Sequence, residues 1–476
     1  MDSDRPPSSL YQLVPQVVAL LLFSIYSQPF LTDIVARLPK QIFFDSSFTV
    51  GLLDLGPMAL VFGVASAAFL VWLFCPLGRG HLDWSQIDSS SGLRWPILGA
   101  AMALAWAYAG HGYNYYYDQG HLWDRLLIVA LMFGILRSPF LIPLFLFEVL
   151  VSRAQFDHPL ATKLPIGDEL PLRALAIVFG CALWNGLLDG LATFRSTRWG
   201  KSLAGWRPPS RVPMHALVFS ILCTIGFYYL GAGLGKMMLG ANALDWLRYS
   251  HMENLFMSSY LNGWLSFLSE ARALEIADAI RVLHLPIVIL TLTFELGTAF
   301  ILIRQRGTLL ILAAISAMHF GIVISSGIIF WKWLTLDLAL LVWLWFRRED
   351  QEVGRMYSKS NALFSVIVIG SLVALFGANQ FSWWNTKWTM LNEVEVLDDE
   401  GEVYRVNYTD FSAYELFDLY KPRDRQNNTY AIGASTVQEV MQFFEDADPE
   451  ELKSFGRGEP GRISGRGKTR DARVFS

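Results

Sequence analysis

The stretch PMHALVFSILCTIGFYYLGAGLGKMML, residues 213–239, decides the fold class of this chain. Lys236 is its only formally charged side chain at neutral pH. About 20 consecutive apolar residues are enough for a helix to cross the hydrocarbon core of a bilayer. The stretch therefore predicts a transmembrane helix that carries one lysine close to one end.

Further apolar runs of spanning length predict further transmembrane helices, at 11–31, 51–75, 95–117, 171–194, 280–303, 308–330 and 361–378, with a shorter run at 333–346. The run 122–152 is too long for one helix and is interrupted by Arg137-Ser138-Pro139. Because proline breaks the hydrogen-bond ladder and a mid-membrane arginine is costly, we expect two short helices that meet at a turn. The sequence predicts an all-α polytopic membrane protein with about nine to eleven transmembrane helices.

The composition agrees with a lipid environment. Of the 476 residues, 53% are apolar and 17% are charged, whereas soluble domains carry roughly 25% charged residues. The net charge is −4, and no basic surface suited to nucleic acid is evident, so no nucleic-acid partner is expected. The three cysteines match no metal-ligand spacing, and no metal site is predicted.

Basic loops predict the orientation. Lys and Arg gather in 195–212, 304–306 and 347–359, which are two spans apart from one another. Since cytoplasmic loops carry an excess of Lys and Arg, we expect these loops in the cytoplasm and everything after 379 on the exoplasmic side. Two arrangements remain open for the N-terminal half. If 122–152 is one helix, the N-terminus lies outside; if it is a hairpin with Arg137 at a cytoplasmic tip, the N-terminus lies inside.

The chain divides into four predicted segments: an N-terminal tail (1–10), a transmembrane domain (11–380), a small exoplasmic α+β domain (381–450) and a disordered tail (451–476). Residues 392–397 and 402–408 flank Asp398-Asp399-Glu400-Gly401 and predict a β-hairpin. Short helices are expected at 410–420 and 434–446. The last segment is rich in Gly and Arg, as disordered tails often are.

Lys236 is the first candidate for chemistry. It follows a run of small residues, Gly231, Ala232, Gly233 and Gly235, which permits close helix approach. A lysine that is kept from water there holds its extra proton less tightly and can act as a base near neutral pH. The alternative is a lysine whose ammonium group snorkels to the membrane interface.

A second group of candidates lies near the end of the run 95–117. His111, Asn114 and Asp118 precede His121. Histidine can donate or accept a hydrogen bond at working pH, which suits a quinone-like or carbonyl ligand. Alternatively, Asp118, Asp124 and Arg125 simply pair with one another at the interface.

Glu295 and His319 lie in the middle of neighbouring predicted spans. Ionisable groups at that depth are candidates for function and are expected to be paired. The alternative is a structural pairing of the two side chains with each other or with a backbone carbonyl.

The segment YYLGAGLGK ending at Lys236, with Trp246 downstream, resembles the signature of the horizontally transferred transmembrane (HTTM) domain family. That family includes the membrane part of vitamin K-dependent gamma-glutamyl carboxylase. Three further places are similar to segments of the family: Glu295, the segment that begins His319-Phe320-Gly321, and the segment His121-Leu122-Trp123. The resemblance covers roughly residues 10–380.

The resemblance implies that Lys236 is the base that deprotonates a lipid quinol similar to vitamin K, with His121 as its partner. It further implies O₂ and CO₂ as co-substrates and a protein or small-molecule substrate, if the chain carboxylates. The chain departs from the carboxylase in having Gly235 where the carboxylase has a second lysine. Fewer than 100 residues are available after residue 380, so we expect no counterpart here to the large luminal substrate domain of the carboxylase. A non-catalytic membrane protein that reuses the fold, such as a transporter, maturation factor or scaffold, is therefore the alternative hypothesis.

Overall fold

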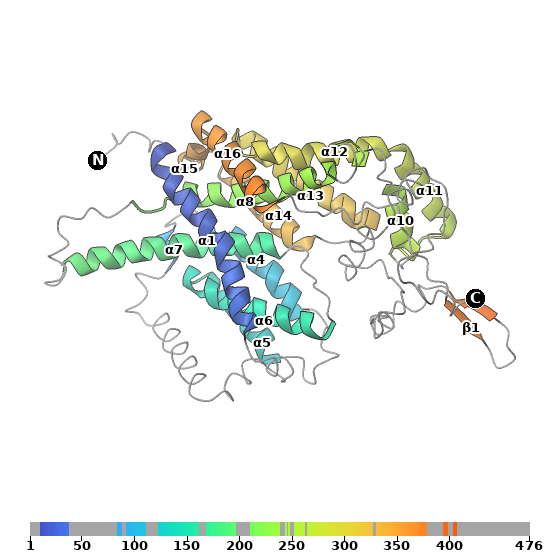
Figure 1. Ribbon diagram of the computed structural model, residues 1–476, viewed down its shortest axis with the longest axis horizontal. Coiled ribbons are helices and arrows are strands. Elements are labelled where there is room, and N and C mark those ends of the chain that lie inside the picture. Colours follow the sequence, from blue (N-terminus) through green and yellow to red (C-terminus); the bar gives the residue numbers. More distant parts are fainter. Residues whose placement is uncertain are drawn as a thin grey trace.

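The computed structural model describes residues 10–37, 83–87, 92–110, 122–160, 168–196, 210–238, 243–244, 246–247, 252–261, 264–326, 330–377, 394–397 and 403–406 (Figure 1). These residues are mostly helical, as the apolar runs predicted. The helices are α1 (Leu10–Ala36), α4 (Arg94–Ala105), α5 (Leu122–Ile135), α6 (Ile142–Leu160), α7 (Glu169–Ser196), α8 (Met214–Met237), α10 (Met252–Leu261), α11 (Glu270–Val282), α12 (His284–Gly297), α13 (Gln305–Ser326), α14 (Trp331–Phe346), α15 (Gln351–Gly354) and α16 (Lys359–Phe376).

Five of these helices have segments long and apolar enough to cross a membrane: Val14–Ala36, Glu169–Ala192, Met214–Met237, Gln305–Ser325 and Lys359–Phe376. Large apolar side chains on the outside of the bundle include Phe30, Trp106, Phe133, Leu310 and Ile324, each at least half exposed. Several ionisable side chains, among them Lys236, Glu295 and Asp337, lie instead among the buried residues. This arrangement suits lipid as the surrounding solvent, because lipid accepts apolar side chains and rejects charged ones. The protein is a multi-pass membrane protein.

The helix formed by the deciding stretch, α8, lies inside the bundle. It packs against α1, α7, α12 and α16 (Figure 1), and nearly every residue from Met214 to Lys236 is buried. Small residues make this possible. A Cβ atom at Gly226 would lie 3.1 Å from the carbonyl oxygen of Thr298 and 2.6 Å from a methyl group of Ile369. Only glycine lets α8 come this close to both neighbours.

The run 122–152 forms two helices, as predicted. Helix α5 ends at Ile135, and α6 follows a single 3₁₀ turn, Pro139–Leu141, that the Ser138 hydroxyl caps. The helices contact each other at two levels, between Gly134 and Leu141 beside the turn and between Asp124 and Glu148 farther away. They therefore run antiparallel, which agrees with the hairpin alternative.

The described parts of the three basic loops lie at one end of the bundle. At the start of α8, His215 Nδ1 lies 3.2 Å from Glu352 Oε2 in α15, and Tyr357 lies beside Thr308 at the start of α13. Near the start of α1, Gln16 donates a hydrogen bond of 2.7 Å to the Ser210 hydroxyl. The first helix therefore begins at the same end as these loops, while Lys236 lies at the opposite end of α8.

One predicted boundary is wrong. The run 280–303 is not a single straight helix, because the chain bends by 62° between α11 and the segment His284–Phe300. The break falls at Leu283, whose backbone conformation is not helical. Polar side chains fill α11, where Arg272 pairs with Glu275 and Arg281 with Asp278. Apolar residues dominate the segment after the bend.

In the C-terminal region two strands, β1 (Val394–Leu397) and β2 (Val403–Val406), pair antiparallel with Val394 opposite Val406. They fall within the two segments predicted as strands. The predicted span 51–75, the helices at 410–420 and 434–446 and the tail 451–476 lie outside the described residues, as do 378–393 and 398–402.

Candidate functional site

The first cluster of polar residues in the bundle is an ion pair between α8 and α12. Lys236 Nζ lies 2.6 Å from Glu295 Oε1, and each side chain is only 5% exposed. The second carboxylate oxygen, Glu295 Oε2, is buried and has no hydrogen-bond partner among the described residues. We refer to Lys236 and Glu295 as the charged pair.

The local sequence explains how the charged pair forms. Gly233 lies one turn before Lys236, and a Cβ atom there would lie 3.0 Å from Glu295 Cβ. The absence of a side chain at Gly233 lets the backbone of α12 approach until the lysine and glutamate meet. The hydroxyl oxygen of Thr298, one turn after Glu295, lies 2.6 Å from the Glu295 carbonyl oxygen and 3.3 Å from that of Gly226 in α8, so its one proton can bond within α12 or across to α8.

Apolar and aromatic residues keep water from the charged pair. Lys236 Nζ lies 5.6 Å from the ring centroid of Trp246, which permits a cation–π attraction. Trp246 packs with Val288 and Leu292, and its indole Nε1 is buried without a described partner. The predicted Trp246 thus lies at the site together with Lys236.

Two structural alternatives from the sequence are wrong. Lys236 does not snorkel to the interface, because it is buried and its ammonium group has a carboxylate partner. Glu295 and His319 do not pair with each other, because Glu295 bonds to Lys236 and His319 to Tyr229. The way the helices pack places the Lys236 ammonium group nearest to Glu295 and the Tyr229 hydroxyl nearest to His319.

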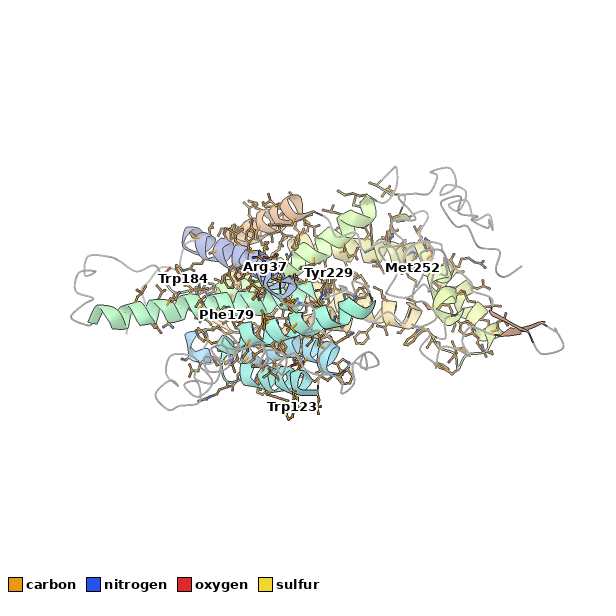
Figure 2. The ribbon with its side chains drawn as sticks, turned by 60° about the horizontal axis from the view of Figure 1, so that its bottom comes forward. Arg37, Trp123, Phe179, Trp184, Tyr229 and Met252 are labelled. Carbon is orange, nitrogen blue, oxygen red and sulfur yellow. The ribbon has the colours of Figure 1, made fainter. Side chains whose placement is uncertain are left out.

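The second cluster joins three helices at the hydroxyl of Tyr229. That oxygen lies 2.6 Å from His319 Nε2 of α13 and donates a hydrogen bond of 2.6 Å to Asp337 Oδ2 of α14. Tyr229 and Asp337 are completely or almost completely buried, and His319 is 3% exposed. Figure 2 shows Tyr229 in the interior of the bundle, whereas Trp123 projects from its edge. We call these three residues the tyrosine cluster.

Aromatic rings enclose the tyrosine cluster. The ring centroids of His319 and Phe330 are 5.2 Å apart, and Trp333 lies 5.2 Å from Tyr229 by the same measure. His319 Nδ1 and Asp337 Oδ1 have no hydrogen-bond partner among the described residues. The cluster is therefore buried among aromatic rings, and His319 and Asp337 each keep one atom that has no partner among the described residues.

The two clusters lie along one stripe of α8. Tyr229, Gly233 and Lys236 have the i, i+4, i+7 spacing of a single helix face. Seven residues of helix correspond to about 10 Å. Electrostatic interactions connect Lys236 with His319 and Glu295 with Tyr229. Helices α12, α13 and α14 thus bring their polar side chains to the same side of the buried helix.

Sequence reasoning missed Tyr229 and Asp337. Asp337 did give a signal in the sequence, because it places a carboxylate inside the apolar run 333–346, where a carboxylate needs a partner. Tyr229 gave no distinct signal, since a tyrosine in an apolar run usually serves packing.

Other buried polar groups serve contacts between helices. Asp168 accepts hydrogen bonds from Tyr108 and Lys332, and Arg153 lies 3.6 Å from it. Asn185 bonds to both backbone groups of Val212. The pocket that the described residues form near His215 and Phe219 is at the far end of α8 from Lys236.

Four predicted site residues lie outside the described part of the chain: His111, Asn114, Asp118 and His121. The alternative pairing of Asp118 with Asp124 and Arg125 is likewise untested, although Asp124 is hydrogen bonded to Glu148. Within the described residues, no group of three or more His, Cys, Asp or Glu side chains is placed to hold a metal ion.

Comparison with known proteins identifies no relative for this chain: no family model, no curated protein and no solved structure matches it.

Proposed function

We propose that this chain is a membrane protein of the HTTM type, related to the membrane domain of vitamin K-dependent gamma-glutamyl carboxylase, in which Lys236 acts as a base toward a lipid quinol. The observation that carries this proposal is the charged pair, with its 2.6 Å contact and two side chains that are each 5% exposed. A buried ion pair is costly to build from helices that could have packed apolar residues instead. Ionisable side chains inside a membrane bundle generally have a function.

The groups around the charged pair fit a quinol. Glu295 Oε2 lacks a described donor and Trp246 Nε1 lacks a described acceptor, and a quinol hydroxyl offers both. Val288 and Leu292 line the same place with apolar surface, which suits a lipid-soluble ring. When bound, the quinol would supply an acidic hydroxyl and two electrons, for which O₂, the co-substrate that the family resemblance implies, would be the acceptor. By the family resemblance, His121 would be a second contact.

The geometry suggests how Lys236 becomes a base. Its ammonium group carries three protons and cannot accept another. Glu295 Oε1 can take one of them across the 2.6 Å hydrogen bond, which leaves a neutral amine beside a neutral carboxylic acid. Exclusion of water favours this exchange because a low-dielectric site disfavours separated charges. The neutral amine can then accept a proton from a hydroxyl placed beside it.

The experiment combines binding with turnover. The purified full chain is analysed by lipid mass spectrometry for a co-purified quinone, and quinol oxidation is measured for wild type, Lys236→Met and Lys359→Met. Lys359 is exposed at the start of α16 and serves as the matched control. We expect Lys236→Met to lose turnover by two or more powers of ten, on the order of the contribution of a general base, and Lys359→Met to retain it. Unchanged turnover in Lys236→Met rejects the proposal.

Proton-coupled transport is a second candidate, favoured by the tyrosine cluster. Chains of ionisable side chains within the membrane are typical of proton-coupled carriers. This alternative predicts substrate flux in proteoliposomes that depends on Glu295 and needs no quinol. A requirement for quinol would exclude it.

Finer parts of the architecture belong to the same proposal. We infer that α4, the α5–α6 hairpin and α14 also lie in the membrane, which with the segment 51–75 gives about nine to eleven spans. By the positive-inside rule the basic loops face the cytoplasm. The C-terminal region is then exoplasmic, with a small α+β domain, and in a bacterium the membrane would be the plasma membrane.

A further inference from the structure

The tyrosine cluster contains two acceptors that compete for one hydroxyl proton. The Tyr229 oxygen lies 2.6 Å from both His319 Nε2 and Asp337 Oδ2. A hydroxyl has a single proton, so it can donate a hydrogen bond to only one of them and must accept a hydrogen bond from the other. Two opposite directions of the hydrogen bonds are compatible with the same positions of the heavy atoms.

The two directions differ by one proton. In the first, His319 Nε2–H donates to Tyr229, and Tyr229 donates to an ionised Asp337. In the second, a protonated Asp337 donates to Tyr229, Tyr229 donates to His319 Nε2, and His319 Nδ1 carries the ring proton. A proton taken up at Nδ1 converts the first into the second: the Nε2 proton moves to the tyrosine oxygen, and the tyrosine proton moves to Asp337 Oδ2. The three side chains thereby gain one positive charge.

A count of charges favours this uptake. The two clusters together contain one ammonium group, Lys236, and two carboxyl groups, Glu295 and Asp337. Glu295 is neutralised by Lys236, whereas no cation contacts Asp337 among the described residues, and its Oδ1 has no described partner. An ionised Asp337 would therefore be an uncompensated charge inside a membrane bundle, which is costly.

The remaining helices against α14 do not supply the missing cation. Helix α4 faces α14 with Gly99, next to Ala339 and Thr335, and its charged residue Arg94 lies over the ring of Trp95. The charged residues of α7 are Glu169, Arg173, Asp189 and Arg195. Of these, Arg173 lies over the rings of Phe227 and Tyr228, and Asp189 pairs with Arg211.

We propose that Tyr229, His319 and Asp337 form an intramembrane proton-binding site, in which Asp337 holds one exchangeable proton that reaches it from His319 through the Tyr229 hydroxyl. The site requires neither a quinol nor a transported substrate. If the protein is a proton-coupled carrier, this site would bind the coupling proton. If it is an enzyme, the site would receive the proton that leaves the charged pair. A failure of the quinol hypothesis would therefore leave it intact.

Infrared spectroscopy of the purified full chain in lipid nanodiscs tests the proposal, with aspartate labelled with ¹³C at its side-chain carboxyl carbon to separate it from glutamate. We expect wild type near neutral pH to show a C=O stretch of a protonated aspartic acid that moves to lower frequency in D₂O. Asp337→Asn, which keeps the shape of the side chain, should remove the contribution of Asp337, so that the wild-type-minus-variant difference spectrum shows this band free of any contribution from the buried Asp124. Asp278→Asn is the matched control, because Asp278 is exposed on α11, and should retain the band.

A second variant tests the route of the proton. Tyr229→Phe removes the hydroxyl but keeps the ring that packs on Trp333. We expect the aspartic acid band to move to higher frequency, because the acid loses its hydrogen-bond partner, and to exchange with D₂O more slowly than in wild type. Absence of a protonated-aspartate band in wild type, or a wild-type-minus-Asp337→Asn difference spectrum without such a band, overturns the proposed site. Unchanged frequency and exchange in Tyr229→Phe overturn the route through tyrosine.

Discussion

Replacement of Lys236 by methionine gives the sharpest test of the charged pair. Methionine matches the length and apolar character of the lysine stem but removes the ammonium group. Glu295 is then left 5% exposed, with neither of its oxygens bonded to a described side chain. Because an unpaired carboxylate is expensive in the bundle, we expect it to take up a proton in the folded variant.

The cost of that proton sets the magnitude. Glutamate in the unfolded chain has an ordinary pKa of about 4.3, so pH 7 lies about 2.7 units above it, and each unit corresponds to about 1.4 kcal/mol. Protonation alone costs roughly 3.7 kcal/mol at pH 7 and about 1 kcal/mol at pH 5. The folded variant binds a proton that the unfolded chain does not, so its stability falls as pH rises. We expect Lys236→Met to lose about 3–4 kcal/mol at pH 7 and most of that loss to disappear near pH 5.

The measurement is the free energy of unfolding by SDS in mixed micelles, followed by tryptophan fluorescence at several pH values. The double variant Lys236→Met/Glu295→Gln carries no charge at the site. It should recover stability to within about 1 kcal/mol of wild type and lose the extra pH dependence, since a neutral pair can replace a buried ion pair at little cost. A loss in Lys236→Met that is the same at pH 5 and pH 7, or a double variant no more stable than the single one, would refute this reasoning.

Two further predictions concern packing and the end of the bundle with the basic loops. Gly233→Ala should destabilise the protein by about 1–3 kcal/mol in the same unfolding assay, because its Cβ would lie 3.0 Å from Glu295 Cβ; the matched change Gly321→Ala, with nothing within 4 Å of its Cβ, should not. Partial burial pushes the pKa of Asp350 up, but hydrogen bonds from Arg347 and two backbone N–H groups outweigh it and hold that pKa below its usual value. The ionised Asp350 therefore stabilises the fold fully above about pH 5, and this stabilisation is lost as pH falls below about 4. Asp350→Ala should lower the free energy of unfolding by about 1 kcal/mol at neutral pH and change it little in acid.

Helix positions follow from the sequence to a large extent, because lipid imposes a minimum length of apolar chain. The break at Arg137-Ser138-Pro139 was predictable for the same reason, since proline and arginine both oppose a continuous span. The bend at Leu283 was not, because Val282, Leu283 and Leu285 continue the apolar run across it.

Pairing between helices was beyond the sequence. Lys236 and Glu295 were each identifiable as buried candidates, yet their contact depends on how far α12 slides along α8, which Gly233 and Thr298 determine through packing. The same holds for His319, whose partner came from α8 rather than from α12. Chemical type could be inferred from single residues, but the register between helices could not.

The burial of α8 has a consequence for how the protein is made. Glu295 follows Lys236 by 59 residues, and Asp337 follows Tyr229 by 108. At a synthesis rate of about 5–20 residues per second, the lysine waits roughly 3–12 seconds for its carboxylate, and the tyrosine about 5–22 seconds. During that interval the ribosome has delivered α1 and α7 as neighbours of α8 but not α12 or α16. The lysine of α8 therefore has to be sheltered during synthesis until α12 follows.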